Sequence, residues 1–469
     1  MTPHRMRLLC LMLLMLAPAA CAPRTFQDPI PVMLSRQNDP SKRLEAAEQA
    51  TKEFRDDPRY AKALDELAWG IGQPENLRLA AMDALIARDE AEFQRVLARR
   101  IVLPELSHTV LEHLYRTGIE RHWPDFTPTV VFRYAIREYG TPDSERMERW
   151  VLTTLNPDKS PEQAVFAVFA DADGKVAPRQ QHAAWELLAR LTPDRAKLTA
   201  LLRQAPPTTP LVADLQAGVD QLHILVHNRE GCLWLAYLRD PQRHDLWEKY
   251  RAQVAHLGPD QLDGLDVRHL AALARSDDAT LALDRAALMH QVEERIDAGE
   301  HHYVTVDPEG GTAELPQRFR DWRDKLCWGD LLTLRSLLGV LSDPKAAAEL
   351  FAQGDANVQD ASTEFGGVLD LQDGQFKAIG YPPFRHGLKT QYTPSQEMIE
   401  RCYTGVAHYH FHAQKYGNKE YAAPGRGDLE TADRLNMSFL VFIFIDRDHL
   451  NVDYYQTGQV SIDLGTIRR

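Results

Sequence analysis

The chain has 469 residues, of which 44% are hydrophobic and 26% are charged, and its formal net charge is −13. This composition is typical of a folded globular protein, and the length predicts roughly two or three domains of about 150 residues each. The acidic balance argues against an electrostatic nucleic-acid binder, which would show a basic face. Beyond the N-terminus the longest apolar run is SFLVFIFI at 438–445. It is shorter than the ~20 residues of a membrane-spanning helix and predicts a buried strand.

The first 20 residues have the layout of a signal peptide. Arg5 and Arg7 precede the apolar run at 8–17, and PAAC at 18–21 closes it. Basic, apolar and small-residue regions in this order are typical of exported proteins. The sequence before Cys21 also resembles the bacterial lipobox, which implies a lipidated Cys21 and a membrane-anchored lipoprotein facing the periplasm or the cell surface. Pro18 departs from the aliphatic residue usual there, so cleavage by an ordinary signal peptidase is the alternative.

Residues 21–40 are rich in proline and polar residues, which predicts a tether after Cys21. From 41 to 353 the apolar residues recur at three- and four-residue spacing, as in KALDELAWGI at 62–71, and predict helices almost throughout. The run LRLAAMDAL at 77–85 resembles one helix of a HEAT-type repeat, in which small alanines let helix pairs pack closely. A HEAT-like solenoid and an irregular helical domain are both consistent with this region. Either would offer a surface for docking a protein partner.

The pattern changes after Gly354. Six short β-type runs follow, at 365–371, 376–381, 403–412, 438–445, 450–456 and 459–465. Turn signals separate them, and helical patterns at 394–403 and 428–436 lie between them, the second with Asp428 in the N-cap position. The fold class predicted for the chain is therefore a mostly α-helical region followed by a small α+β domain at 354–469.

The third of these strand-like segments includes GVAHYHFHAQ at 405–414, which is rich in histidine. Side chains at alternate positions of a strand share one face, so His408, His410 and His412 lie together and two neighbours can chelate one metal. A catalytic zinc site takes three protein ligands and needs a general base within reach of water. Asp428 and Glu364 are the candidates for these two further roles.

The order Glu-x-Gly-Gly-x-Leu, a helix, His-x-His, a loop and an Asp at the start of a helix resembles the JAMM/MPN family of zinc isopeptidases. Glu364 precedes His410 by 46 residues, close to the spacing in that family. The resemblance implies that Zn²⁺ is held by His410, His412 and Asp428. It also implies that Glu364 takes a proton from the attacking water and hands it to the leaving amine.

This chain departs from the family pattern at three places. Ala413 replaces the proline after the second histidine, and the loop before Asp428 carries an insertion. Gly425 replaces the family serine whose hydroxyl helps to stabilise the oxyanion. Backbone amides of Gly425, Arg426 or Gly427 are candidate replacements for that hydroxyl, since glycine lets the backbone approach closely. His408 with His410 is the alternative ligand pair.

Two functions follow as hypotheses. The first is an exported zinc hydrolase of amide or isopeptide bonds in a protein or peptide substrate, with a helical region that docks a partner. The second is a lipid-anchored helical scaffold carrying a catalytically inactive JAMM-like binding module. A third hypothesis, a sugar- or peptide-binding lipoprotein without metal, has the least support.

Overall fold

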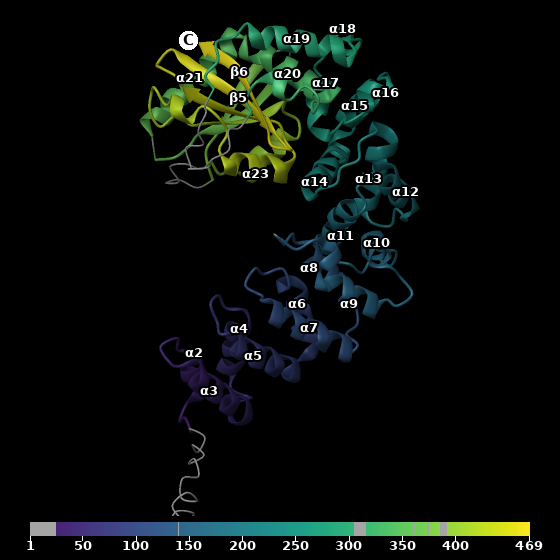
Figure 1. The fold of residues 1–469 in the computed structure, drawn as a ribbon, viewed down its shortest axis with the longest axis vertical. Coiled ribbons are helices and arrows are strands. Elements are labelled where there is room, and N and C mark those ends of the chain that lie inside the picture. Colours follow the sequence, from purple (N-terminus) through teal and green to yellow (C-terminus); the bar gives the residue numbers. More distant parts are fainter. Residues whose placement is uncertain (1–24, 139, 304–315, 361, 373–374, 385–391) are drawn as a thin grey trace, which may run out of the picture. The chain divides into compact units, whose positions relative to one another are not determined.

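The structure is a computed structural model, and it describes residues 25–469 apart from 139, 304–315, 361, 373–374 and 385–391 (Figure 1). The predicted signal peptide and Cys21 lie outside the described residues. The chain divides into two compact units, residues 1–164 and 165–469, with helix α10 (Pro161–Ala170) at the boundary. Among the described residues no helix is both long and apolar enough to cross a membrane.

The described part of the first unit is helical. Asp39 and Asp57 each cap a helix that begins with proline, because their carboxylates accept a backbone N–H of the first turn. Residues 21–40, predicted to be a tether, include a short helix that buries Ile30 and Met33. The helices are α2 (Pro29–Leu34), α3 (Pro40–Glu53), α4 (Pro58–Trp69), α5 (Glu75–Arg88), α6 (Glu90–Arg100), α7 (His108–Glu120), α8 (Phe126–Ala135), the 3₁₀ turn η1 (Asp143–Glu145) and α9 (Met147–Leu155).

The HEAT-like run at 77–85 lies in α5, which packs against α3, α4, α6 and α7. Packing on near neighbours in the sequence is consistent with a repeat-like architecture. Arg78 of this run is buried and donates to the carbonyl oxygens of Ala68 (3.2 Å) and Gly70 (2.9 Å). It therefore binds carbonyls that the end of α4 leaves without helical partners.

The second unit combines further helices with one sheet. Its helices before the sheet are α11 (Pro178–Leu191), α12 (Arg195–Gln204), α13 (Pro210–Leu222), α14 (Arg229–Leu238), η2 (Pro241–Arg243), α15 (His244–Val254), α16 (Pro259–Leu262), η3 (Val267–His269), α17 (Leu270–Leu273), α18 (Asp278–Leu281), α19 (Arg285–Asp297), η4 (Phe319–Asp321), α20 (Trp328–Leu341) and α21 (Pro344–Gln359). The change of pattern noted at Gly354 falls inside α21, since that helix continues to Gln359.

The sheet has six strands in the order β2-β1-β3-β4-β5-β6. Only β3 and β4 are parallel, and helix α23 (Arg426–Leu435) lies in the connection between them, as a parallel crossover requires. The strands are β1 (Gly366–Gln372), β2 (Gln375–Tyr381), β3 (Ala407–Phe411), β4 (Phe439–Phe444), β5 (His449–Gln456) and β6 (Val460–Arg468), with α22 (Gln396–Cys402) and η5 (Lys419–Tyr421) between them. All six predicted strand segments are strands, and the expectation of helices followed by a small α+β region is confirmed.

The two faces of the sheet differ in chemistry. One face carries Tyr409 and Phe411 and packs against α21, where a side chain at Gly354 would collide with the ring of Phe444. Gly354 therefore allows the helix to lie close to the sheet. The opposite face carries the histidines of β3 and, further along the sheet, the buried polar residues of β5 and β6. The candidate site lies on this second face.

Asp453 on this polar face is fully buried beside a second carboxylate. Its Oδ2 accepts from Asn451 Nδ2 (2.9 Å), its Oδ1 has no hydrogen-bond partner among the described residues, and Asp463 lies opposite it in the β5–β6 register. Burial, followed by the charge of Asp463, raises the pKa of Asp453 well above its usual range. Folding therefore favours the protonated form of Asp453 at pH values between its unfolded and its raised folded pKa.

We expect Asp453→Asn to stabilise the protein at high pH. A raised folded-state pKa contributes stability that is present below the unfolded pKa of about 3.9 and is lost as pH rises toward the folded pKa. Asparagine keeps the shape and the acceptor for Asn451 but does not ionise. The difference in the free energy of unfolding between variant and wild type should grow by up to about 1.4 kcal/mol per pH unit between pH 4 and the folded pKa. Denaturant melts at pH 4 and pH 8 measure this, and an equal difference at both pH values would contradict it.

Candidate metal centre

The predicted site residues meet on the polar face of the sheet. Strand β3 supplies His410, and His412 follows its last residue. In the antiparallel β1–β3 register Gly366 lies opposite His410, and Phe411 N donates to Phe365 O (3.0 Å). This pairing brings Glu364, two residues before β1, beside His412. Two segments more than 40 residues apart in the sequence are therefore direct neighbours across the β1–β3 pair.

The ring nitrogens and carboxylates converge closely. His410 Nε2 and His412 Nε2 are 3.1 Å apart. One oxygen of Asp428 lies 3.4 Å from His410 Nε2, and the other lies 3.4 Å from His412 Nε2. Glu364 offers a carboxylate oxygen within 4.8 Å of both histidine nitrogens. Two imidazoles and a carboxylate are the ligand types of catalytic zinc sites.

Both imidazoles present their Nε2 atoms to this centre. His412 Nδ1 lies 3.3 Å from the carbonyl oxygen of Tyr421, which only accepts, so Nδ1 carries the hydrogen there. His410 Nδ1 lies 3.4 Å from the hydroxyl of Tyr455. Metal-binding histidines are commonly held through the second ring nitrogen in this way.

The helix that carries Asp428 begins earlier than the sequence predicted. Asp428 is the third residue of α23, and Gly425, rather than Asp428, is the N-cap. From the third position the carboxylate reaches back and accepts from Gly425 N at 2.8 Å. The amide of Gly425 is therefore engaged in holding Asp428. The amides of Arg426 and Gly427 belong to the first helical turn, where N–H groups have no partner within the helix.

Burial and charge shift the pKa values of the cluster. Glu364 is only 3% exposed, and this burial raises its pKa. Burial disfavours the charged form of His412, but the carboxylate of Asp428 outweighs it and raises the pKa of His412 to about 9. Despite burial, His410 and His412 hold the pKa of Asp428 well below its usual range. The charged His412 imidazole must lose a proton before it can bind a metal together with Asp428.

His408 does not join this cluster. It is buried between the rings of Tyr392 and Phe439, and neither of its ring nitrogens has a hydrogen-bond partner in the described part of the chain. Burial, then the neighbouring His410, lowers the pKa of His408 to about 3. Among the described residues the ligand group here consists of Glu364, His410 and His412, without His408. The geometry therefore favours that pair over His408 with His410.

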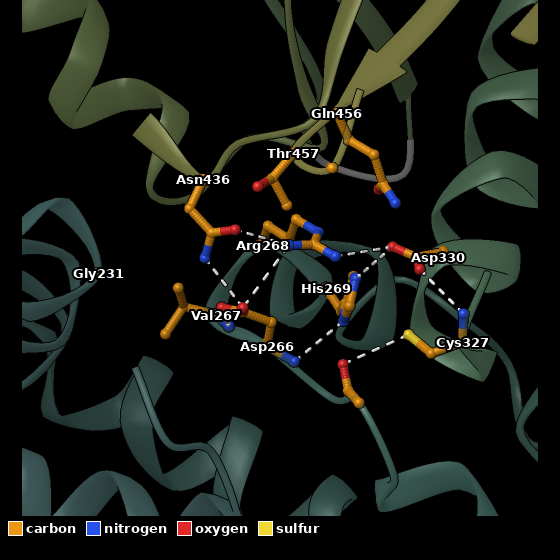
Figure 2. Close-up of polar contacts among 12 residues, drawn as sticks. Gly231, Asp266, Val267, Arg268, His269, Cys327, Asp330, Asn436, Gln456 and Thr457 are labelled. Carbon is orange, nitrogen blue, oxygen red and sulfur yellow. Dashed lines mark hydrogen bonds and ion pairs between the residues drawn. The ribbon is translucent and has the colours of Figure 1, made fainter. Parts of the chain in front are cut away.

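A second group of ligand types, which sequence reasoning missed, lies elsewhere in this unit. His269, Cys327 and Asp330 also offer ligand atoms within 4.8 Å of one another. The spacing of these three residues in the sequence matches no recognisable metal-binding motif. Figure 2 shows them in a network with Asp266, Arg268 and Asn436.

Hydrogen bonds already occupy both ring nitrogens of His269 and both carboxylate oxygens of Asp330. Asp266 N donates to His269 Nδ1 (3.0 Å), so Nε2 carries the ring hydrogen and donates to Asp330 Oδ1 (3.0 Å). Arg268 also donates to Asp330 Oδ1 (3.0 Å), and Cys327 N donates to its Oδ2 (2.9 Å). The neutral ring therefore has no free nitrogen for a metal, and this trio is an interior ion-pair network.

The network fixes the far end of α23. Asn436, which follows the helix with φ 53°, accepts from Arg268 (2.7 Å) and donates to Asp266 Oδ2 (2.9 Å). Asp433 on the same helix accepts from Gly458 N (2.8 Å) in the turn between β5 and β6. These contacts hold α23, whose first turn carries Asp428.

Comparison with models of known protein families gave no match, and comparisons with curated proteins and with solved structures gave none. The site is therefore interpreted from its own geometry. The residues fit a zinc ion, because two Nε2 atoms and the oxygens of Asp428 face one another while both Nδ1 atoms are held from outside.

Proposed function

We propose that the second unit is a zinc-dependent hydrolase of amide or isopeptide bonds. The observation that carries the proposal is the convergence of His410 Nε2, His412 Nε2 and the Asp428 carboxylate within 3.4 Å, beside the buried Glu364. The sequence resemblance to JAMM/MPN enzymes, which share this set of residues, supports the same assignment.

Each residue has a distinct role in this proposal. His410, His412 and Asp428 would hold zinc, since Asp428 is the carboxylate that contacts both ring nitrogens. When bound, zinc supplies Lewis acidity toward a carbonyl oxygen and lowers the pKa of water to about 7. Glu364 takes the proton of the attacking water on its carboxylate and delivers it to the leaving nitrogen. A buried carboxylate with a raised pKa suits both halves of that transfer.

The first turn of α23 supplies the donor that the family serine would provide. Gly425 N is engaged by Asp428, so the amides of Arg426 and Gly427 are the donors available to an oxyanion in this proposal. We expect Arg426→Pro, which removes one of these N–H groups, to lower turnover about 10²- to 10³-fold with zinc content unchanged. Proline fits the first helical position, and Gly425 has the φ −73° and ψ 171° that precede proline easily.

Arg426→Ala is the matched control for this variant. The Arg426 side chain is mostly exposed and pairs with Glu430 (2.9 Å) on the surface, so alanine should leave turnover unchanged. Steady-state kinetics of the zinc-loaded variants would measure the difference. Equal turnover in Arg426→Pro and Arg426→Ala would contradict a role for this amide.

The second candidate function is an inactive binding module on a lipid-anchored scaffold. Gly425 in place of the family serine favours it, because one oxyanion donor is typically worth ~10²–10³ in rate. In this alternative the metal would shape a binding surface. Zinc binding without hydrolysis of any amide or isopeptide probe is the result that would select it.

Export and partner binding complete the proposal. The signal-peptide pattern and Cys21 support a membrane-anchored lipoprotein at the periplasmic or outer surface, and the helical region offers a docking surface for a protein partner. The substrate would then be a protein or peptide in that compartment.

The test of the proposed function is metal and activity analysis of the purified protein. Elemental analysis should find about one zinc per chain after loading and dialysis. A panel of fluorogenic peptides with isopeptide bonds at lysine Nζ should be cleaved by the loaded protein and not after chelation. Absence of stoichiometric zinc would reject the proposal.

A further inference from the structure

We propose that Tyr455 is a positioning residue for the metal centre, which holds His410 in the tautomer and orientation that direct Nε2 at the metal. The inference rests on the proposed function, because it concerns the same site. Nothing in the sequence near Tyr455 marks it, since it lies 45 residues beyond His410.

The sheet register brings Tyr455 to the site. On the polar face His410 pairs with Val441 of β4, and Tyr455 of β5 pairs with Phe439, two residues away on the same face of β4. The Tyr455 ring stacks on Phe439 (centroids 5.0 Å apart, interplanar angle 18°) and meets the His410 ring edge-on at 89°. Its hydroxyl then lies 3.4 Å from His410 Nδ1.

Burial makes this hydroxyl decisive for the tautomer of His410. His410 is 3% exposed and Tyr455 is 1% exposed, so water does not compete freely for Nδ1. A neutral imidazole that gives Nε2 to a metal carries its hydrogen on Nδ1, and that hydrogen needs an acceptor in the interior. The tyrosine oxygen is a good acceptor for it. An N–H left unpaired at this depth would lose its hydration without a replacement hydrogen bond.

The other histidine is held differently. His412 Nδ1 faces the backbone carbonyl of Tyr421, which no substitution removes. A substitution of Tyr455 can therefore alter the orientation of His410 without replacing any of the proposed zinc ligands. Outer-shell partners of this kind typically contribute about 10- to 100-fold to metal affinity.

The test compares Tyr455→Phe with Tyr454→Phe. Both tyrosines are buried neighbours on β5, but Tyr454 points to the opposite face, where its hydroxyl donates to Gln456 (2.5 Å). Zinc affinity of the full chain is measured by competition with a chelator, and the visible spectrum of the Co²⁺-loaded protein reports ligand geometry. We expect Tyr455→Phe to bind zinc about 10- to 100-fold more weakly and to shift the Co²⁺ spectrum, while Tyr454→Phe changes neither.

Thermal melts of the metal-free variants separate this role from a structural one. Each variant loses one buried hydroxyl, so similar melting temperatures with different zinc affinities support positioning. An equal loss of zinc affinity in both variants, or none in Tyr455→Phe, would overturn the inference.

A measurement on the wild-type protein covers the case in which Tyr455→Phe does not fold. Nitrogen-15 spectra of histidine-labelled, zinc-loaded protein should show His410 with its hydrogen on Nδ1, and a hydrogen on Nε2 would overturn the inference. Failure of the wild type to bind zinc would instead reject the proposed function, so the two failures are distinguishable.

Discussion

Zinc is expected to be lost when His412 is replaced by alanine and retained when His408 is replaced by phenylalanine. His412 Nε2 lies 3.1 Å from His410 Nε2 and 3.4 Å from Asp428, whereas His408 is outside the ligand group. Removing a ligand should weaken zinc binding by more than the about 10- to 100-fold that an outer-shell partner contributes. Elemental analysis of the purified, dialysed variants measures the difference.

His408→Phe is the matched control because it changes a neighbouring histidine on the same strand face. Phenylalanine keeps the aromatic contacts with Phe439 and Tyr392 and removes two buried ring nitrogens that have no hydrogen-bond partner among the described residues. The folded protein should therefore tolerate it. Zinc lost from His408→Phe and kept in His412→Ala would show that His408 and His410 are the ligand pair.

Glu364→Gln should keep zinc and lose hydrolysis. The glutamine amide matches the carboxylate in shape and still accepts the backbone N–H of Tyr392, but it cannot take a proton. General-base catalysis typically contributes 10²- to 10⁴-fold, so turnover of the isopeptide probes should fall by about that factor. Circular dichroism and zinc content should match those of the wild type.

Asp428→Asn is the comparison that distinguishes a metal ligand, the role proposed for Asp428, from a general base, the role proposed for Glu364. Asp428 contacts both histidine nitrogens and caps α23 through Gly425 N, so its neutral variant should lose zinc as well as activity. Loss of zinc from Glu364→Gln with retention in Asp428→Asn would mean that the two carboxylates exchange roles. Unchanged turnover in Glu364→Gln would remove the general base from the mechanism.

Part of the site could not be predicted because it depends on register. Sequence alternation placed His408, His410 and His412 on one face, and the family resemblance favoured His410 with His412 while His408 with His410 remained the alternative. The β1–β3 pairing decides between them, since it sets Gly366 opposite His410 and brings Glu364 beside His412. A shift by one residue would turn every histidine to the apolar face.

Local sequence patterns also did not predict the start of α23 or the contacts between segments far apart in the chain. Asp428 was expected to be the N-cap, but the helix begins two residues earlier because Gly425 takes that position and Asp428 caps it from within the first turn. Tyr455 and the His269 network carry no spacing signal. Each is assembled from segments tens of residues apart whose meeting depends on packing.

The sequence by itself determined the helical first part and the six strands, because periodicity and turn residues are local properties. For the candidate site it offered only candidates, which were Glu364, Asp428 and the three histidines at 408, 410 and 412. Only the tertiary structure decided which histidines converge, that Gly425 N is engaged with Asp428, and that Tyr455 faces His410 Nδ1. These are distances between segments far apart in the chain. They follow from strand register and helix placement, which the packing of the whole unit sets.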